Sequence, residues 1–274
     1  MLTALILTLN EADIIERCLS RLSFVDEIIV LDSGSTDNTV EICLSLGATV
    51  EHRKFDNYAN QRNYGLSLVR KGWILMLDAD EMVEAEFRNE IQSFLQDVPK
   101  DTTMGLVRRK DIFFGKWLRF AGFYPTWIPR MFKADSVSVE RSINEEYHSQ
   151  GKIHLFQAHI IHFPFHKGCD EWYIKHMNYS SMEAEHLAEE KISIISDVKF
   201  LVSGDKLTKR AALKRLSFHL PLRTNLLWFY LVIFKLGFLD GPKGLLFISM
   251  RLTYEKVIID KIKNIRFKAE NSVD

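Results

Sequence analysis

The stretch WILMLDADEM (residues 73–82) joins a run of apolar side chains directly to three acids, Asp78, Asp80 and Glu81. The apolar part is typical of a buried β-strand. Side chains of a strand alternate between its faces, so Asp78 and Asp80 point the same way if the chain stays extended. Two neighbouring carboxylates repel each other unless a cation lies between them. The stretch therefore predicts a strand that ends at a ligand-binding edge of a sheet.

Further apolar runs surround this strand, and segments with helical spacing separate them. The runs lie at residues 4–9, 27–31 and 48–50. One helical face is predicted for Ile14, Ile15, Cys18, Leu19 and Leu22. The residues Asn38 to Glu41 resemble a capping box that begins a helix to Leu46, and Gly47 would end it. Nearly continuous apolar strands that alternate with helices predict an α/β fold, with a parallel sheet covered on both faces.

Polar residues follow several of these strands. Asn10 and Glu11 follow the first, Asp32 the second, and Asp78 and Asp80 the fourth. Ligands of open α/β sheets bind beyond the carboxyl ends of the strands, where these residues would gather. A divalent metal bound to a phosphate-bearing ligand would neutralise the two acids. The sequence therefore predicts a site for a metal diphosphate.

Two plainer interpretations remain open for these acids. Asp80 or Glu81 could serve only as the N-cap of the next helix, whose apolar face includes Phe87 and Ile91. Asp32 could serve only as a hydrogen-bond acceptor for the turn SGSTDNT that follows it.

The composition predicts a folded globular protein, and the cysteine pattern is typical of a reducing compartment, so we expect the cytoplasm. The chain has 274 residues, of which 47% are hydrophobic and 26% charged, enough for a sizeable core. Cys18, Cys43 and Cys169 lack CxxC spacing, so we expect neither a disulfide nor a zinc site. The N-terminal apolar run has no preceding Lys or Arg and is broken by Asn10 and Glu11, so we expect neither a signal peptide nor an anchor.

The motifs TLNEAD, VLDSGSTDNT, FDNYANQRNYGL and WILMLDADE resemble, in this order, the nucleotide-sugar domain of family 2 glycosyltransferases, which have the GT-A fold. The motifs PRMF, INEEYH, IIHFPF and GFLDGPKGLL resemble a bacterial subgroup that adds hexoses, typically β-linked glucose, to the lipopolysaccharide inner core. The resemblance implies a GT-A catalytic domain at residues 1–195 and a helical, basic and apolar C-terminal region at residues 196–274.

The resemblance also implies roles for the residues at the ends of the first two strands. Thr8, Asn10 and Glu11 would line the nucleotide pocket, and Asp32 would accept a hydrogen bond from uracil or ribose. The donor implied is a nucleotide-sugar, UDP-glucose above all.

A second group of residues would contact the rest of the donor. Gln61 and Arg62 would face the nucleotide or its phosphates, Asp78 the ribose or sugar, and Asp80 would bind Mg²⁺ or Mn²⁺. Arg130 could bind a phosphate of donor or acceptor, or could be a surface arginine in a salt bridge.

Transfer to a sugar hydroxyl with inversion requires a base for the proton of that hydroxyl. In INEEYH the resemblance assigns this role to Glu145, with Glu146 as the alternative base. The subgroup usually has His before this Glu, whereas this chain has Asn144, which leaves the acceptor open. Two solvated acids on a loop are the plainer interpretation.

Histidines cluster in HLFQAHIIHFPF, which is typical of a strand. His162 and His166 have a spacing that occurs in metal sites, but i and i+4 residues of a strand lie far apart. We therefore expect hydrogen-bonded histidines, with His162 near the metal or diphosphate by resemblance.

The C-terminal third combines positive charge with an apolar block. Residues 199–268 contain fifteen Lys and Arg and four acids, and a basic stretch at 206–215 precedes LLWFYLVIFKLGFL (226–239). The block is shorter than the roughly 20 residues of a membrane span. It could lie in the inner leaflet near a lipid-linked acceptor, or form a core helix hairpin closed by Gly237 and Gly241. Its aromatics are not interleaved with cations, which argues against nucleic-acid binding.

Several functions remain open at this point. The first is an inverting, metal-dependent glycosyltransferase with a glycolipid acceptor. The others are a sugar nucleotidyltransferase, a transferase with a polysaccharide or peptide acceptor, and a membrane-surface module without activity. A nucleotidyltransferase would have a Gly-rich loop after the first strand, which TLNEAD lacks.

Overall fold

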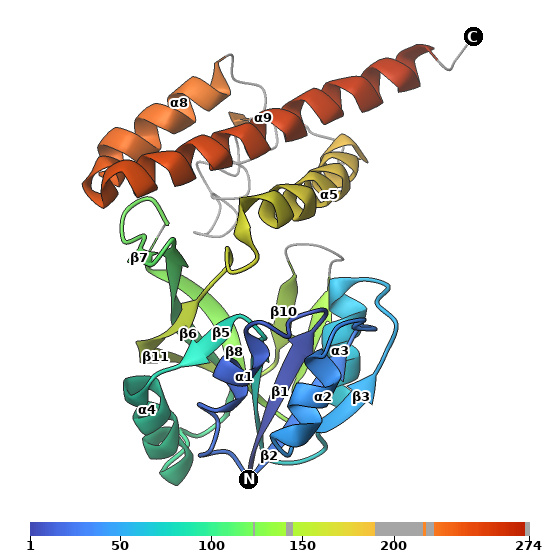
Figure 1. The fold of residues 1–274 in the computed structure, drawn as a ribbon, viewed down its shortest axis with the longest axis vertical. Helices are drawn as coiled ribbons and strands as arrows, with labels where there is room; N and C mark the ends of the chain where they lie inside the picture. Colours follow the sequence, from blue (N-terminus) through green and yellow to red (C-terminus); the bar gives the residue numbers. More distant parts are fainter. Residues whose placement is uncertain (123, 141–144, 190–215, 218–221, 272–274) are drawn as a thin grey trace. The chain divides into compact units, whose positions relative to one another are not determined.

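A computed structural model of the chain describes residues 1–122, 124–140, 145–189, 216–217 and 222–271 (Figure 1). Its contacts divide the chain into two compact units, Met1–Lys167 and Gly168–Asp274. The division precedes the boundary expected at residue 195. The helix Gly168–Glu189, which the expected boundary would place in the catalytic domain, therefore belongs to the second unit.

A mixed sheet forms the centre of the first unit. Its strands are β1 (Leu2–Thr8), β2 (Glu27–Asp32), β3 (Thr49–His52), β4 (Trp73–Asp78), β5 (Glu81–Val83), β6 (Thr102–Phe113), β7 (Lys116–Trp117), β8 (Thr126–Lys133) and β11 (Lys152–His162). Their order is β3-β2-β1-β4-β8-β6-β11-β5, with β7 paired to β6. A separate hairpin pairs β9 (Val137–Glu140) with β10 (Glu146–Ser149).

The strand directions determine which ends share an edge of the sheet. Strands β1 to β4 are mutually parallel, as predicted. Strand β8 is antiparallel to both β4 and β6, and β11 is parallel to β6. The carboxyl ends of β1, β2, β4, β6 and β11 therefore meet at one edge, here called the ligand edge. The α/β fold with a parallel and mixed sheet is confirmed.

Helices cover both faces of this sheet, because β1, β2 and β4 are buried on both sides. One face packs against α1 (Ile15–Leu19), α2 (Thr39–Ser45) and α4 (Ala85–Gln96). The other face packs against α3 (Tyr58–Ser67) and the strand β9. The helical face predicted from Ile14 to Leu22 is buried as expected.

The ends predicted for α2 are confirmed, since Asn38 is its N-cap and Leu46 its C-cap, but the capping hydrogen bond expected there and the caps considered for α4 are wrong. The side chain of Asn38 makes no capping hydrogen bond; instead the Asp37 carboxylate accepts one from the Thr39 N–H at 3.1 Å. The N-cap of α4 is Glu84, so neither acid proposed for that position caps this helix. Glu81 lies in β5.

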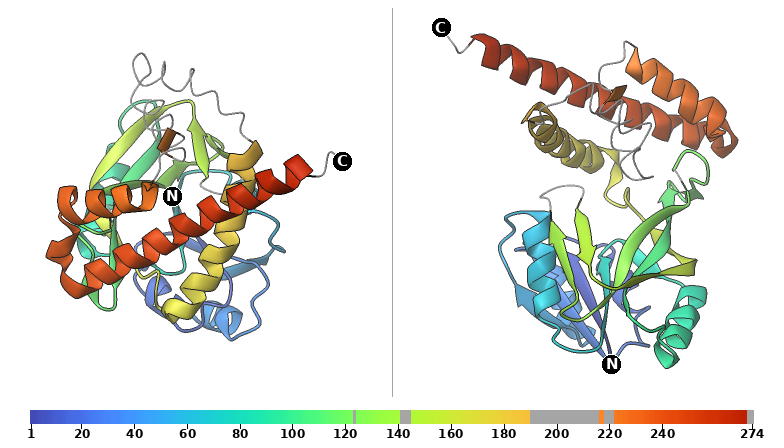
Figure 2. Two further views of the ribbon diagram at one scale, coloured as in Figure 1. Left: turned by 90° about the horizontal axis from the view of Figure 1, so that it is seen from above. Right: turned by 180° about the vertical axis from the view of Figure 1, so that it is seen from behind.

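The second unit is helical in its described part. Helix α5 (Gly168–Glu189) crosses α9 (Gly241–Asn271), and Ala184, Leu187, Ile258 and Ile262 are buried between them (Figure 2). The apolar block spans the end of α8 (Arg223–Phe229), a π-turn (Tyr230–Phe234) and a 3₁₀ turn (Gly237–Asp240). None of the described helices is both long and apolar enough to cross a membrane. The basic stretch at 206–215 lies outside the described residues.

The predicted hairpin is present, and its turn explains both glycines. A Cβ atom at Gly237 would lie 2.7 Å from the carbonyl oxygen of Leu231, which leaves no room for a side chain. Gly241 has a φ of 65°, a conformation that favours glycine, at the point where α9 begins. Leu231 and Val232 are buried, but most other side chains of the block are exposed.

Candidate active site

The loop after β2 folds around Asp32. This carboxylate is 1% exposed and accepts hydrogen bonds from the N–H groups of Gly34 at 2.9 Å and Ser35 at 3.0 Å. From β1, the Asn10 side chain accepts one from the Thr36 N–H at 2.7 Å. These contacts confirm that Asp32 is an acceptor for its own turn. Its contact with uracil or ribose stays a prediction.

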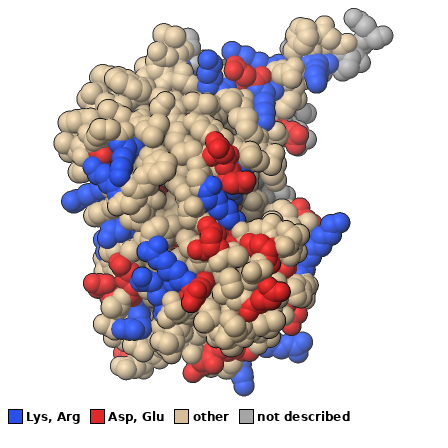
Figure 3. All heavy atoms as spheres, viewed as in Figure 1, with Lys and Arg blue, Asp and Glu red and all other residues tan. Residues whose placement is uncertain are grey.

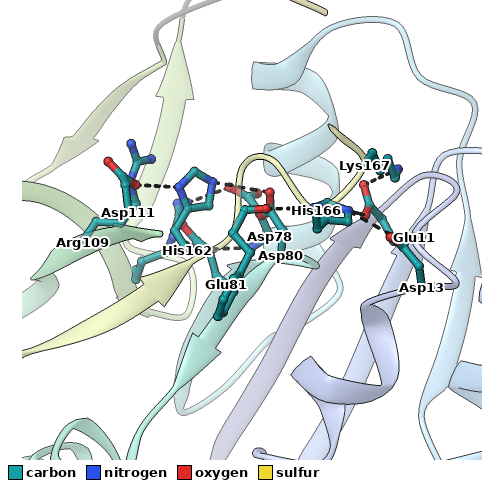
Figure 4. A network of polar contacts seen from close by, with 12 residues as sticks. Glu11, Asp13, Asp78, Asp80, Glu81, Arg109, Asp111, His162, His166 and Lys167 are labelled. Carbon is teal, nitrogen blue, oxygen red and sulfur yellow. Dashed lines mark hydrogen bonds and ion pairs between the residues drawn. The ribbon is translucent and has the colours of Figure 1, made fainter. Parts of the chain in front are cut away.

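Glu11 lies at the same edge and is held by two basic side chains. Its carboxylate lies 2.6 Å from His166 Nε2 and 2.8 Å from Lys167 Nζ (Figure 4). Burial favours neutral His166, but hydrogen bonds to Glu11 and to the Phe163 carbonyl raise its pKa. Asp13 joins this group at 3.8 Å from His166. Glu11, Asp13 and His166 could together hold a metal ion, because one ligand atom of each lies within 4.8 Å of the others.

Thr8 and Gln61 occupy different surroundings from each other. The Thr8 hydroxyl is buried and has no hydrogen-bond partner among the described residues. Such a group is commonly satisfied by water or a ligand. The Gln61 side chain is buried too, but it donates to Ser33 Oγ at 3.0 Å. Gln61 therefore anchors the loop after β2.

Arg62 links the end of β4 to the segment before β10. Its Nη2 donates to Asp78 at 3.2 Å and its Nε to Glu145 at 3.0 Å. Burial disfavours the charged guanidinium, but the charges of Asp78 and Glu145 raise its pKa well above the usual value. The buried Nη1 atom has no hydrogen-bond partner among the described residues. Arg62 therefore brings together two residues that are 67 positions apart in the sequence.

Arg130 holds the other side of Asp78. It binds Glu81 through two hydrogen bonds of 2.7 and 2.8 Å, and Asp78 through one of 2.7 Å. Its side chain is 6% exposed and that of Glu81 is fully buried, so the interpretation of Arg130 as a surface residue is wrong. The guanidinium positions Asp78, and phosphate binding by Arg130 stays a prediction.

Glu145 and Glu146 are distinguished by their surroundings. The Glu145 side chain is 20% exposed and faces Arg62. Glu146 begins β10, on the strand hairpin, and is exposed. Asn144 lies outside the described residues. Of the two acids, Glu145 is the one that Arg62 joins to Asp78.

Asp80 has a histidine as its cationic neighbour. Its Oδ2 lies 3.4 Å from His162 Nε2, and Nδ1 of the same ring lies 2.7 Å from Asp111 Oδ1 (Figure 4). Burial opposes protonation of His162, but the charge of Asp80 and the hydrogen bond to Asp111 raise its pKa to about 9. His162 and His166 have separate partners and do not form a pair.

The residues around Asp80 are suited to a divalent cation. A carboxylate oxygen and an imidazole nitrogen are ligands that Mn²⁺ and Mg²⁺ sites use, the second more readily for Mn²⁺. Asp111 orients the ring from its far side, as the hydrogen-bond partners of ligating histidines do. Asp78, by contrast, is engaged by two arginines. The donor set therefore fits a cation held by Asp80 and His162 with a diphosphate.

Sequence reasoning did not identify Asp111 or the role of Glu81. Asp111 adjoins the basic run Arg108 to Lys110, and its position opposite His162 depends on the pairing of β6 with β11. Glu81 was considered only as a cap. Glu81 stands beside two other acids directly after an apolar run, and a carboxylate buried in such a place needs a cationic partner.

Comparisons with known sequences agree on one family. The sequence matches the profile described as "Glycosyl transferase family 2" over residues 3–167. A protein of Rickettsia felis named "Uncharacterized glycosyltransferase" is 30% identical over 206 residues, 69% of this chain and 71% of that protein. The "Lipopolysaccharide core biosynthesis glycosyltransferase LpsC" of Rhizobium meliloti is 30% identical over 99 residues, 34% of this chain and 37% of that protein.

Solved structures with some similarity were also found. Residues 1–349 of S. aureus TarS in complex with UDP give a TM-score of 0.47 at 13% identity, over 99% of this chain and 91% of that chain. Glucosyl-3-phosphoglycerate synthase of Mycobacterium tuberculosis, in complex with Mn²⁺ and UDP-glucose, gives 0.35 at 21% identity, over 41% and 44%.

Proposed function

The chain belongs to glycosyl transferase family 2 and is a glycosyltransferase that uses a nucleotide-sugar donor. From this premise we propose that it transfers glucose from UDP-glucose, with inversion, to a sugar of a lipopolysaccharide inner core or related glycolipid. The observation that best supports a transferase site is the network at the ligand edge, in which Arg62 joins Asp78 to Glu145.

The donor binds along the carboxyl ends of β1, β2 and β4 in this proposal. Thr8 offers a buried hydroxyl without a partner among the described residues, and Asn10, Glu11 and Asp32 shape the nucleotide pocket. Asp78, fixed from both sides by arginines, contacts the ribose or sugar. The positions of the two arginines mean that Asp78 needs little reorganisation when the donor arrives.

Asp80 and His162 would hold a divalent cation, Mg²⁺ or Mn²⁺, together with the donor diphosphate. The cation neutralises negative charge that develops on the leaving diphosphate. A pKa of about 9 means that His162 is protonated at neutral pH, so its Nε2 would have to lose a proton in order to hold a metal. Asp111 keeps the ring in place in both states.

Glu145 accepts the proton of the acceptor hydroxyl. As the oxygen attacks, the bond to the anomeric carbon forms, the bond to the diphosphate breaks, and the proton moves to the Glu145 carboxylate. Arg62 binds one oxygen of this carboxylate and orients it. A single carboxylate suffices because the diphosphate leaves without protonation, unlike the leaving group of a glycosidase.

The second unit brings the enzyme to the inner face of the cytoplasmic membrane in this proposal. The hairpin exposes large apolar side chains, with Phe234 at 72% and Leu239 at 51% exposure, and carries Lys235 and Lys243 nearby. Figure 3 shows wide areas of this unit without charged side chains. Exposed aromatics beside cations favour the surface of an anionic bilayer, where a glycolipid is presented.

One experiment tests the donor and the base together. The purified protein is incubated with UDP-sugars and Mn²⁺, and UDP release is followed with and without truncated lipopolysaccharide. Asp80→Ala should abolish transfer and weaken metal-dependent donor binding, whereas Glu145→Gln should abolish transfer and leave donor binding intact.

Glu146→Gln is the matched control and should retain transfer. Wild-type turnover by Glu145→Gln would refute the assignment of the base. If no UDP-sugar is turned over or bound, the choice of donor is wrong.

A further inference from the structure

A cluster of cations and aromatic rings lies on strands β6, β7 and β8 and has no part in the donor site. We call it the aromatic–basic platform. It consists of Arg108, Lys110, Trp117 and Trp127.

Strand pairing places these residues on one face of the sheet. Arg108 is opposite Trp127, and Ile112 is opposite Trp117, so the even-numbered residues of β6 and both rings point the same way. Lys110 Nζ lies 4.6 Å from the centre of the Trp117 ring. The guanidinium of Arg108 lies 5.9 Å from the centre of the Trp127 ring. The rings and cations therefore form one continuous surface.

Two cations of the platform have only neutral partners among the described residues. Arg108 donates to the Ala158 carbonyl at 3.4 Å, and Lys110 lies 3.0 Å from His159 Nε2. Burial and the charge of Lys110 lower the pKa of His159, so this ring is neutral near pH 7, although Glu84 lies 3.6 Å from it.

Arg109 provides the contrast, because it lies on the opposite face of the same strand and pairs with Asp111 at 2.9 Å. Arg62 and Arg130 also bind carboxylates. The platform thus differs from these three arginines, since neither Arg108 nor Lys110 pairs with a carboxylate among the described residues. An anion placed there would be attracted strongly in such half-buried surroundings.

The platform adjoins the proposed reaction site in the topology of the sheet. It lies near the carboxyl end of β6 and the amino end of β8, which is the ligand edge. Its face is the one that packs against α3, the helix that carries Arg62 and hence holds Glu145. A sugar bound on the platform would therefore approach from the side of the proposed base.

We propose that the aromatic–basic platform is an acceptor subsite for an anionic sugar, one that carries a phosphate or carboxylate group. Arg108 and Lys110 bind the anion, and the indole rings pack against the apolar face of the sugar. The indole N–H of Trp117 is buried without a hydrogen-bond partner among the described residues and donates to a sugar oxygen. The role of this sugar as the acceptor rests on the proposed function, whereas the binding of an anionic sugar to the platform does not.

Calorimetric titration of the purified protein with three probes tests the subsite. Glucose 6-phosphate should bind more tightly than either glucose or inorganic phosphate, because only it engages both the cations and the rings. Lys110→Gln should weaken binding of glucose 6-phosphate by about tenfold, the effect expected for one charge-assisted contact. Trp127→Leu should reduce the preference for glucose 6-phosphate over phosphate.

Lys133→Gln is the matched control, because Lys133 is exposed on the same strand as Trp127 but lies at the opposite edge, beside Trp73. It should leave all three affinities unchanged. Equal affinity for phosphate and glucose 6-phosphate would overturn the subsite, as would binding that Lys110→Gln does not weaken. Hydrolysis of UDP-glucose by the wild-type protein without acceptor tests the proposed function separately, so the two failures are distinguishable.

Discussion

Replacement of Arg130 by Met should destabilise the first unit strongly. Its guanidinium is the partner of Glu81, a carboxylate with no exposed surface, at 2.7 and 2.8 Å. Without it, the one remaining hydrogen bond that Glu81 accepts from the described residues is that of the Asp78 N–H, at 3.2 Å. Loss of one partner of a buried ion pair typically costs about 3–5 kcal/mol. Asp78 adds little, because it keeps Arg62 and is one-third exposed.

A second substitution tests whether the uncompensated charge causes this loss. The double variant Arg130→Met/Glu81→Met contains no buried charge at this position, so most of the stability should return, to within about 1–2 kcal/mol of wild type. Urea unfolding followed by circular dichroism and tryptophan fluorescence measures both variants. Lys152→Met removes an exposed pair with Asp101 and should cost less than about 1 kcal/mol.

The reasoning is refuted if the single and double variants are equally unstable. It is also refuted if Arg130→Met costs no more than the exposed control. Either result would mean that Arg130 does not stabilise the first unit by balancing the buried charge of Glu81.

Three further perturbations have clear expected results. Gly65→Ala should destabilise the first unit by about 1–3 kcal/mol in urea unfolding, because its Cβ would lie 2.8 Å from a methyl of buried Leu5 and push α3 off the sheet. The second unit should lose stability as the pH falls from 6.5 towards 4, because burial lowers the pKa of His176 to about 4 and the unfolded chain then binds more protons; His176→Gln should flatten this profile in thermal melts. Phe234→Ser should weaken sedimentation with anionic vesicles, whereas Leu155→Ser, equally apolar and 49% exposed in the first unit, should not.

The parallel half of the sheet and its helices were predictable because their signals are local. Strands β1, β2 and β4 are uninterrupted apolar runs, and the face of α4 repeats with a helical period. The antiparallel half was less predictable. Strand β6 carries the basic run Arg108 to Lys110, and its position in the sheet depends on pairing with β8 and β11. Only tertiary contacts could reveal that pairing.

The gathering of polar residues at the ligand edge was also predictable, since the carboxyl ends of parallel strands meet there. Their individual partners were not. Arg62 reaches Glu145 across 83 positions, and Arg130 reaches Asp78 across 52. Neither arginine has a local signal that separates a buried ion pair from a ligand contact. Resemblance therefore assigned Arg62 to the nucleotide or its phosphates, and Arg130 stayed open between a phosphate of donor or acceptor and a surface salt bridge.

The three acids of residues 73–82 show why charge alone did not specify a metal. Each has a cationic side chain of its own: Asp78 has two arginines, Glu81 shares one of them, and Asp80 has His162. The repulsion expected between neighbouring carboxylates is therefore relieved within the protein. Of these cations only His162 can lose its charge near neutral pH, because arginine does not deprotonate in proteins. Among the acids of residues 73–82, Asp80 is thus the one at which a metal can replace a proton without leaving an unpaired buried arginine, which is why the proposed metal site is centred there.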